Sequence, residues 1–251
     1  MPKAHLWLIW MINLYWRYEC ILFMKVLFVE NKYKTKLYNL ISKEIESNDY
    51  DVHFLIQNKL FMGRGSNHFI SNISYIVNPE VEMLYLRSVD FVRVSDRNVN
   101  YFGGDDKHYK GYFYSIYNAL KNISPSIVYG ESTLFHELIT IYICNALEIP
   151  YFHPSSCRMP SGRFSFYRYD TLEPTQNNPV FVSDVEVKEF ISSYGLREKK
   201  LDYMTKPSVL GGWKRTARLT KNWFSSYVSN LVFDKYNTPS LSRKLRLQLQ
   251  L

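Results

Sequence analysis

Short apolar runs and amphipathic segments alternate along the chain between residues 25 and 194. Apolar runs bounded by turn residues predict buried strands, whereas apolar residues spaced three and four positions apart predict helices that pack one face on a core. On this basis we predict strands at 25–30, 51–56, 74–77, 126–131 and 149–155. We predict helices at 36–47, 109–122, 134–147 and 183–194, with a loop at 168–182.

Strands that alternate with helices in this way predict a parallel sheet joined by right-handed crossovers. The helix at 134–147 is apolar nearly all round, so we expect it to lie between other elements. The expected fold class is α/β, a Rossmann-like parallel sheet with flanking helices over residues 24–196 and a helical basic tail after it. Ligands of such sheets bind outside the carboxyl ends of the strands, near the point where the strand order reverses.

Residues 1–23 are treated as an apolar N-terminal extension. The run at 4–23 is rich in Trp, but Arg17 and Glu19 interrupt it, whereas a spanning helix needs about 20 predominantly apolar residues. No small-residue cleavage site of a secretory signal follows it. Two interpretations stay open: an interfacial helix on a membrane surface, or translation that starts at Met24 instead of Met1.

The positive charge of the chain is concentrated near its carboxyl end. The formal net charge is +8, yet residues 197–251 contain twelve Lys and Arg against three acidic residues. The rest of the chain is therefore close to neutral, and no nucleic-acid-binding module is recognisable, so we expect no nucleic-acid partner. This basic, aromatic segment predicts either a solvated face or a surface that binds anionic lipid. From residue 196 to 251 we recognise no second set of alternating strands and helices.

The cysteine and glycine patterns argue against several kinds of site. The three cysteines, Cys20, Cys144 and Cys157, are odd in number and contain no CxxC pair, which argues against a disulfide framework or a structural zinc site and fits a reducing compartment. We therefore expect a cytoplasmic protein with no metal. The first strand runs into "VENKYKTK" without a GxGxxG pattern, which disfavours a dinucleotide-binding turn.

One group of candidate residues follows the strand at 126–131. Glu131 lies at the carboxyl end of this strand, where a carboxylate can orient a sugar hydroxyl or act as a general base. His136 lies within the first turns of the next helix and is a candidate substrate-binding residue. The alternative is structural, because acidic residues at a helix N-terminus also complement the helix dipole.

A second group lies in "HPSSCRMPSGRFSFY" (residues 153–167), which begins in the last residues of the strand predicted at 149–155 and continues beyond it. His153, Arg158 and Arg163 are predicted to bind substrate, since guanidinium groups match phosphate and carboxylate bidentately. Gly162 would permit close approach of the backbone to a ligand. The alternative is a structural loop held by ion pairs between arginine and carboxylate.

The segment "GESTLFHELITIYICNALEIPYFHPSSCRMPSGRFSFY" resembles one found in bacterial capsular polysaccharide biosynthesis proteins, which are glycosyltransferases of GT-B type. The resemblance spans roughly residues 24–174 and rests on the turn at Glu131 and on the loop Gly162-Arg163-Phe164. It implies two facing Rossmann-like domains, with a nucleotide-sugar donor bound mainly by the second. This chain matches the amino-terminal half only.

The resemblance therefore implies an acceptor-side domain that acts on surface polysaccharide, with Glu131 as the catalytic residue and a sugar or glycan acceptor as partner. Such a chain would be an enzyme if a second domain or subunit completed it, and truncation before that domain is the expectation. The alternative function is a non-catalytic peripheral membrane or assembly protein that uses the basic segment 197–251. Either function places the chain in the cytoplasm, peripherally at the inner membrane.

Overall fold

A computed structural model describes residues 24–102, 105–156, 164–173, 175 and 183–195, together with single positions at 217, 220, 224, 228 and 236. The predicted N-terminal extension, the loop at 157–163 and nearly all of the basic segment lie outside the described residues. The statements below concern the described part of the chain.

The described residues form a six-stranded sheet with the order β3-β2-β1-β4-β5-β6. Its strands are β1 (Lys25–Val29), β2 (Asp51–Ile56), β3 (Ser66–Phe69), β4 (Ile127–Tyr129), β5 (Tyr151–Ser156) and β6 (Phe164–Arg168). Strands β1 to β5 pair in parallel, and β6 pairs antiparallel with β5. The chain builds outward from β1 to β3 on one side and then from β4 to β6 on the other, so the strand order reverses between β1 and β4.

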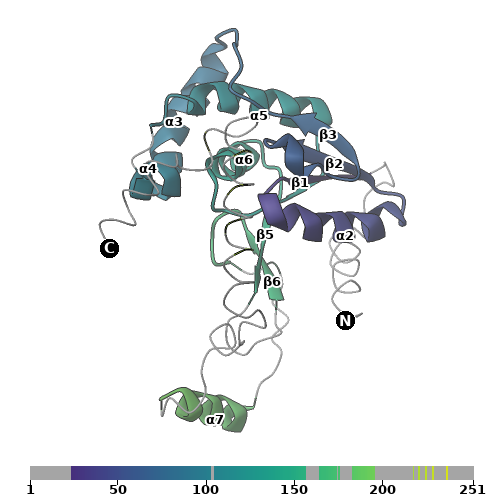
Figure 1. Ribbon diagram of the computed structural model, residues 1–251, viewed down its shortest axis with the longest axis vertical. Coiled ribbons are helices and arrows are strands. Elements are labelled where there is room, and N and C mark those ends of the chain that lie inside the picture. Colours follow the sequence, from purple (N-terminus) through teal and green to yellow (C-terminus); the bar gives the residue numbers. More distant parts are fainter. Residues whose placement is uncertain are drawn as a thin grey trace.

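Helices lie between the strands and after the last of them. They are η1 (Lys32–Lys34), α2 (Thr35–Glu46), η2 (Lys59–Phe61), α3 (Pro79–Ser95), α4 (Arg97–Phe102), α5 (Tyr109–Ile123), α6 (Phe135–Ala146) and α7 (Asp184–Gly195). Helix α2 covers one face of the sheet, and α3, α5 and α6 lie on the other, which gives three layers (Figure 1). Helix α7 stands apart from these layers, beyond the hairpin of β5 and β6 (Figure 1).

Side chains of β1 point alternately to the two faces of the sheet and so contribute to the hydrophobic core on each face. Val26 and Phe28 pack beneath α2, whereas Leu27 and Val29 pack beneath α5 and α6. Successive side chains of a strand point to opposite faces, so a strand covered on both sides must be apolar at every position. The run at 25–29 satisfies this condition, and all its residues except Lys25 are buried.

The α/β class and most of the predicted elements are confirmed, with three corrections. The strand predicted at 74–77 is wrong, because these residues are irregular and the third strand is β3. Helix α3 was not predicted, although Asn78 caps it by accepting a hydrogen bond from the Glu80 N–H at 3.0 Å and Pro79 begins it. The sheet is not wholly parallel, since β6 turns back along β5 in a region where we expected only loop.

Tyr236, one of the single described positions near the carboxyl end, contacts the sheet domain. Its ring stacks on His108 at 4.2 Å between centroids and meets Tyr112 edge-on. Asn72 donates a hydrogen bond to the Tyr236 hydroxyl at 3.4 Å, and Asn98 donates one to its carbonyl at 2.7 Å. Because His108 precedes α5 and Asn72 follows β3, this contact lies at the carboxyl edge of the sheet.

No helix among the described residues is long and apolar enough to cross a membrane.

Gly130, directly after β4, tests how tightly this edge is packed. A Cβ there would lie 2.2 Å from the Tyr151 hydroxyl and 2.9 Å from the Val29 Cβ. We expect Gly130→Ala to lower the free energy of unfolding by about 2–4 kcal/mol, because overpacking a buried strand end displaces both neighbours. Urea unfolding followed by circular dichroism measures the change.

Gly111→Ala is the matched control for this prediction. A Cβ at Gly111 would meet the end of the Asn72 side chain and, at 3.1 Å, the Ile73 backbone nitrogen. Asn72 can turn aside at the cost of its long hydrogen bond to Tyr236, and alanine suits a helix interior better than glycine. We expect an effect of at most about 1 kcal/mol. Equal losses from the two substitutions would contradict the argument for Gly130.

Candidate functional site

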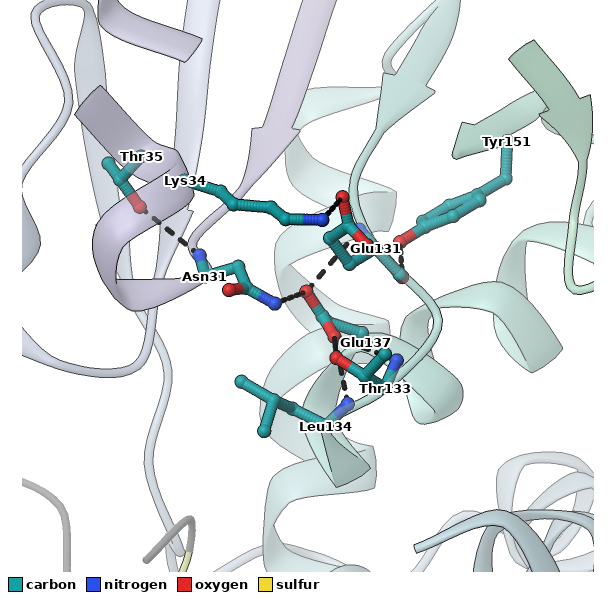
Figure 2. A network of polar contacts seen from close by, with 8 residues as sticks. All are labelled: Asn31, Lys34, Thr35, Glu131, Thr133, Leu134, Glu137 and Tyr151. Atoms are coloured by element: carbon teal, nitrogen blue, oxygen red, sulfur yellow. Dashed lines mark hydrogen bonds and ion pairs between the residues drawn. The ribbon is translucent and has the colours of Figure 1, made fainter. Parts of the chain in front are cut away.

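The carboxyl ends of β1 and β4 meet where the strand order reverses, and acidic residues follow both strands. Glu30 follows β1, and Glu131 follows β4 after Gly130. Both residues are buried, with exposed fractions of 1% and 7%. Figure 2 shows the polar network that joins the segment after β1 to the turn between β4 and α6. The edge that doubly wound sheets use for ligands is therefore lined here by carboxylates.

Glu131 forms an ion pair with Lys34, which reaches it from the end of η1 (Figure 2). The Glu131 side chain is 9% exposed and that of Lys34 is 49% exposed, so the pair lies at the boundary between core and solvent. Burial raises the pKa of Glu131, the nearby Lys34 ammonium opposes this rise, and the charge of Glu137 adds to it. A carboxylate with a raised pKa is better matched to proton transfer near neutral pH than an exposed one.

Glu137 holds the turn between β4 and α6 together. Its Oε2 accepts hydrogen bonds from the Thr133 N–H at 3.1 Å, the Thr133 hydroxyl at 3.2 Å and the Leu134 N–H at 2.8 Å. Its Oε1 accepts from the Glu131 N–H at 3.3 Å and from the Asn31 amide at 2.7 Å. The Glu137 side chain is fully buried. Its carboxylate therefore takes the place that a ligand or water would otherwise have as acceptor for the N–H groups at the start of α6.

This arrangement has a chemical consequence for the edge. In phosphate-binding α/β proteins, the N–H groups of a strand-to-helix turn point at the phosphate oxygens. Here the N–H groups of Glu131, Thr133 and Leu134 donate to Glu137 instead. A phosphate would have to displace that carboxylate and approach two further acidic residues, so the geometry disfavours phosphate binding at this turn.

Glu30 connects the ends of β1 and β2. It accepts hydrogen bonds from the Lys32 N–H at 2.6 Å and from the Asn58 N–H at 3.0 Å. The ring Nε2 of His136 donates to the Glu30 carbonyl at 2.7 Å. His136 is itself fully buried, so it contributes to the edge by fixing the backbone at Glu30.

Tyr38 lies one helical turn after Lys34 on α2 and stacks on Phe28. Burial raises its pKa, and the charges of Glu131 and Glu137 raise it further. Its hydroxyl is buried and has no hydrogen-bond partner within the described residues. The phenol therefore stays protonated beneath the acidic edge.

The structure separates the predicted site residues into three groups. Glu131 lies at the sheet edge with Lys34, and His136 lies beneath it. His153 lies in the hairpin of β5 and β6, where its ring stacks on Tyr167 and its Nδ1 donates to the Tyr169 carbonyl at 2.5 Å. The remaining three predicted residues, Arg158, Gly162 and Arg163, lie outside the described residues, so their approach to Glu131 stays a prediction.

Sequence reasoning did not find Lys34, Asn31 or Glu30 as parts of this edge. Glu30 and Asn31 follow an apolar run directly, which is the position that supplies ligand-facing side chains in parallel sheets. Lys34 gave no signal of its own, because it is one of several lysines between residues 32 and 36. Only the crossover into α2 brings it to Glu131.

Among the described residues, no group of three or more His, Cys, Asp and Glu is arranged to hold a metal ion.

No protein-family model matches this chain, and a search of curated proteins finds no match.

The raised pKa of Glu131 predicts a pH dependence of stability. The folded protein holds this proton more tightly than the unfolded chain, where the pKa is about 4.3. Wild-type stability should therefore fall as pH rises from that value through the folded pKa, and the Glu131→Gln variant lacks this loss. We expect the stability of the variant relative to wild type to increase between pH 4 and neutrality, as measured by urea unfolding. A difference that stays constant or shrinks would contradict the shift.

Glu137→Ala should destabilise the fold much more than a surface substitution. It leaves buried donors at the turn and at Asn31 without their acceptor, and we expect a loss of about 3–5 kcal/mol. The exposed Glu44 on α2 is the control, and Glu44→Ala should change stability by less than about 0.5 kcal/mol. Urea unfolding of both variants decides this, and comparable losses would refute the role given to Glu137.

Proposed function

We propose that this chain supplies the acceptor-side domain of a GT-B-type glycosyltransferase that builds bacterial surface polysaccharide. Glu131 acts as the general base that accepts the proton of the attacking sugar hydroxyl. The donor is a nucleotide-sugar bound mainly by a second Rossmann-like domain or subunit. The reaction takes place on the cytoplasmic side of the inner membrane.

The observation that carries the proposal is the placement of Glu131 at the point where the strand order reverses. Its carboxylate has a pKa raised by burial and a single lysine as ion-pair partner among the described residues. A base needs a pKa near the working pH and a fixed orientation. The backbone on either side of the carboxylate is held, because Tyr151 donates to the Glu131 carbonyl at 2.6 Å and the Glu131 N–H donates to Glu137.

The acidic edge favours the acceptor side over the donor side. A sugar hydroxyl is a hydrogen-bond donor and fits a carboxylate, whereas the diphosphate of a nucleotide-sugar needs N–H groups or cations. At this turn Glu137 already occupies the N–H groups, and Lys34 is paired with Glu131. This supports an arrangement in which the donor phosphates bind elsewhere.

Replacing Glu131 with glutamine tests the catalytic role. The amide keeps the shape of the side chain but cannot accept the proton, so we expect transfer to fall by about 100-fold or more. The gene is deleted in its host and complemented with wild type or Glu131→Gln. Isolated membranes are then assayed for incorporation of label from a panel of radiolabelled UDP-hexoses, and surface polysaccharide is measured by sugar analysis.

Glu44→Gln on the exposed face of α2 is the matched control, and it should behave as wild type. Protein abundance is measured in every strain, so that loss of protein is not mistaken for loss of chemistry. Wild-type incorporation by Glu131→Gln at equal abundance would rule out the role of general base. Unchanged surface polysaccharide after deletion of the whole gene would rule out the function itself.

The alternative, a non-catalytic protein that binds anionic membranes through residues 197–251, rests on the charge of that segment alone. Nearly all of the segment lies outside the described residues, so this alternative stays a prediction.

A further inference from the structure

Helix α3 has two distinct faces. Val81, Ser88 and Val92 are buried against the neighbouring helices. On the opposite face Met83, Leu86 and Val94 are 56%, 62% and 76% exposed. Apolar side chains repeated along the solvent side of one helix are unusual for a surface helix, whose outer face is ordinarily polar.

Two charged residues complete this outer face. Arg87 makes no ion pair within the described residues, and the Asp90 side chain is 93% exposed. The ion pair that Asp90 makes there is with Arg93 at 3.9 Å, while Arg93 donates two hydrogen bonds to Asp106. Arg87 and Asp90 are thus neighbours of opposite charge, three positions apart on the exposed face of α3.

Four residues of the outer face lie symmetrically about its centre, whereas the counterpart of Leu86 is Phe91, which packs against the core. Met83 and Val94 lie at equal distances in sequence from the point between Ser88 and Val89, and so do Arg87 and Asp90. If two copies of the helix lie antiparallel across a twofold axis at this point, Met83 of each copy meets Val94 of the other. Arg87 of each copy then meets Asp90 of the other. The face is therefore complementary to itself, because apolar side chains meet apolar side chains and each arginine meets an aspartate.

We propose that α3 is the interface of a homodimer, in which it packs antiparallel against α3 of a second copy of this chain. Ile76 and Val77, in the segment before the helix, are 93% and 58% exposed and extend the apolar area. One helix pair gives an interface near the lower limit of specific complexes, so we expect a dissociation constant on the order of 10 µM.

The dimer leaves the candidate site open. Helix α3 packs on α5 and α6, whereas Lys34 reaches Glu131 from the segment that leads into α2 on the other face of the sheet. The inference is thus independent of the proposed function, and either one can fail alone.

Charge reversal tests the pairing directly. Arg87→Asp places Asp opposite Asp in a homodimer, and Asp90→Arg places Arg opposite Arg. Each variant alone should be monomeric at concentrations where wild type is dimeric. An equimolar mixture should form heterodimers, because both contacts then join Asp to Arg. Sedimentation equilibrium between roughly 1 and 100 µM measures the association of wild type, of each variant alone and of the mixture. Native mass spectrometry of the mixture identifies the heterodimer.

Lys43→Asp and Glu44→Arg on the exposed face of α2 are the matched controls, and both should dimerise as wild type does. Leu86→Asp should be monomeric with an unchanged circular dichroism spectrum. A wild-type protein that is monomeric at 100 µM would overturn the proposal. Variants that dimerise as wild type does would overturn it too, and so would two monomeric variants that fail to associate when mixed.

Discussion

The fold and the candidate site both depend on the buried carboxylate of Glu137. It receives hydrogen bonds from the backbone of the turn between β4 and α6 and from Asn31 in the segment after β1. It thereby joins two strand ends that are neighbours in the sheet but far apart in sequence. It therefore fixes the backbone at Glu131 and the turn from which α6 begins. Because the carboxylate accepts hydrogen bonds from N–H groups that could otherwise bind a phosphate, it also makes the edge unfavourable for phosphate binding.

The carboxyl edge of this Rossmann-like sheet is acidic, and the N–H groups of its turn after β4 are not available to a phosphate. Proteins with this architecture usually bind negatively charged cofactors at the reversal of strand order, by means of glycine-rich turns. Here the turn after β1 contains no glycine and the turn after β4 is closed by Glu137. The edge carries a buried carboxylate with a raised pKa on a fixed backbone, and this supports the proposal that its ligand is a sugar hydroxyl.

The sequence predicted the layered α/β fold and the position of Glu131 because both depend on strong local signals. Buried strands such as β1 are apolar at every position, and a residue that follows such a strand must emerge at the carboxyl edge. Strand β3 was missed because "SNHF" is polar and lies at the border of the sheet. Its side chains are not buried, and the strand is held by its backbone pairing with β2. Lys34 was missed for another reason, since its partner is 97 positions away and only tertiary structure sets their contact.

The docking of Tyr236 has a consequence for the order in which this protein forms. Synthesis proceeds from the amino terminus, and every strand of the sheet precedes residue 168 or ends there. His108 and Tyr112, whose rings contact Tyr236, are therefore translated together with the sheet and before Tyr236 itself. The contact with Tyr236 can therefore form only after all six strands of the sheet have been translated.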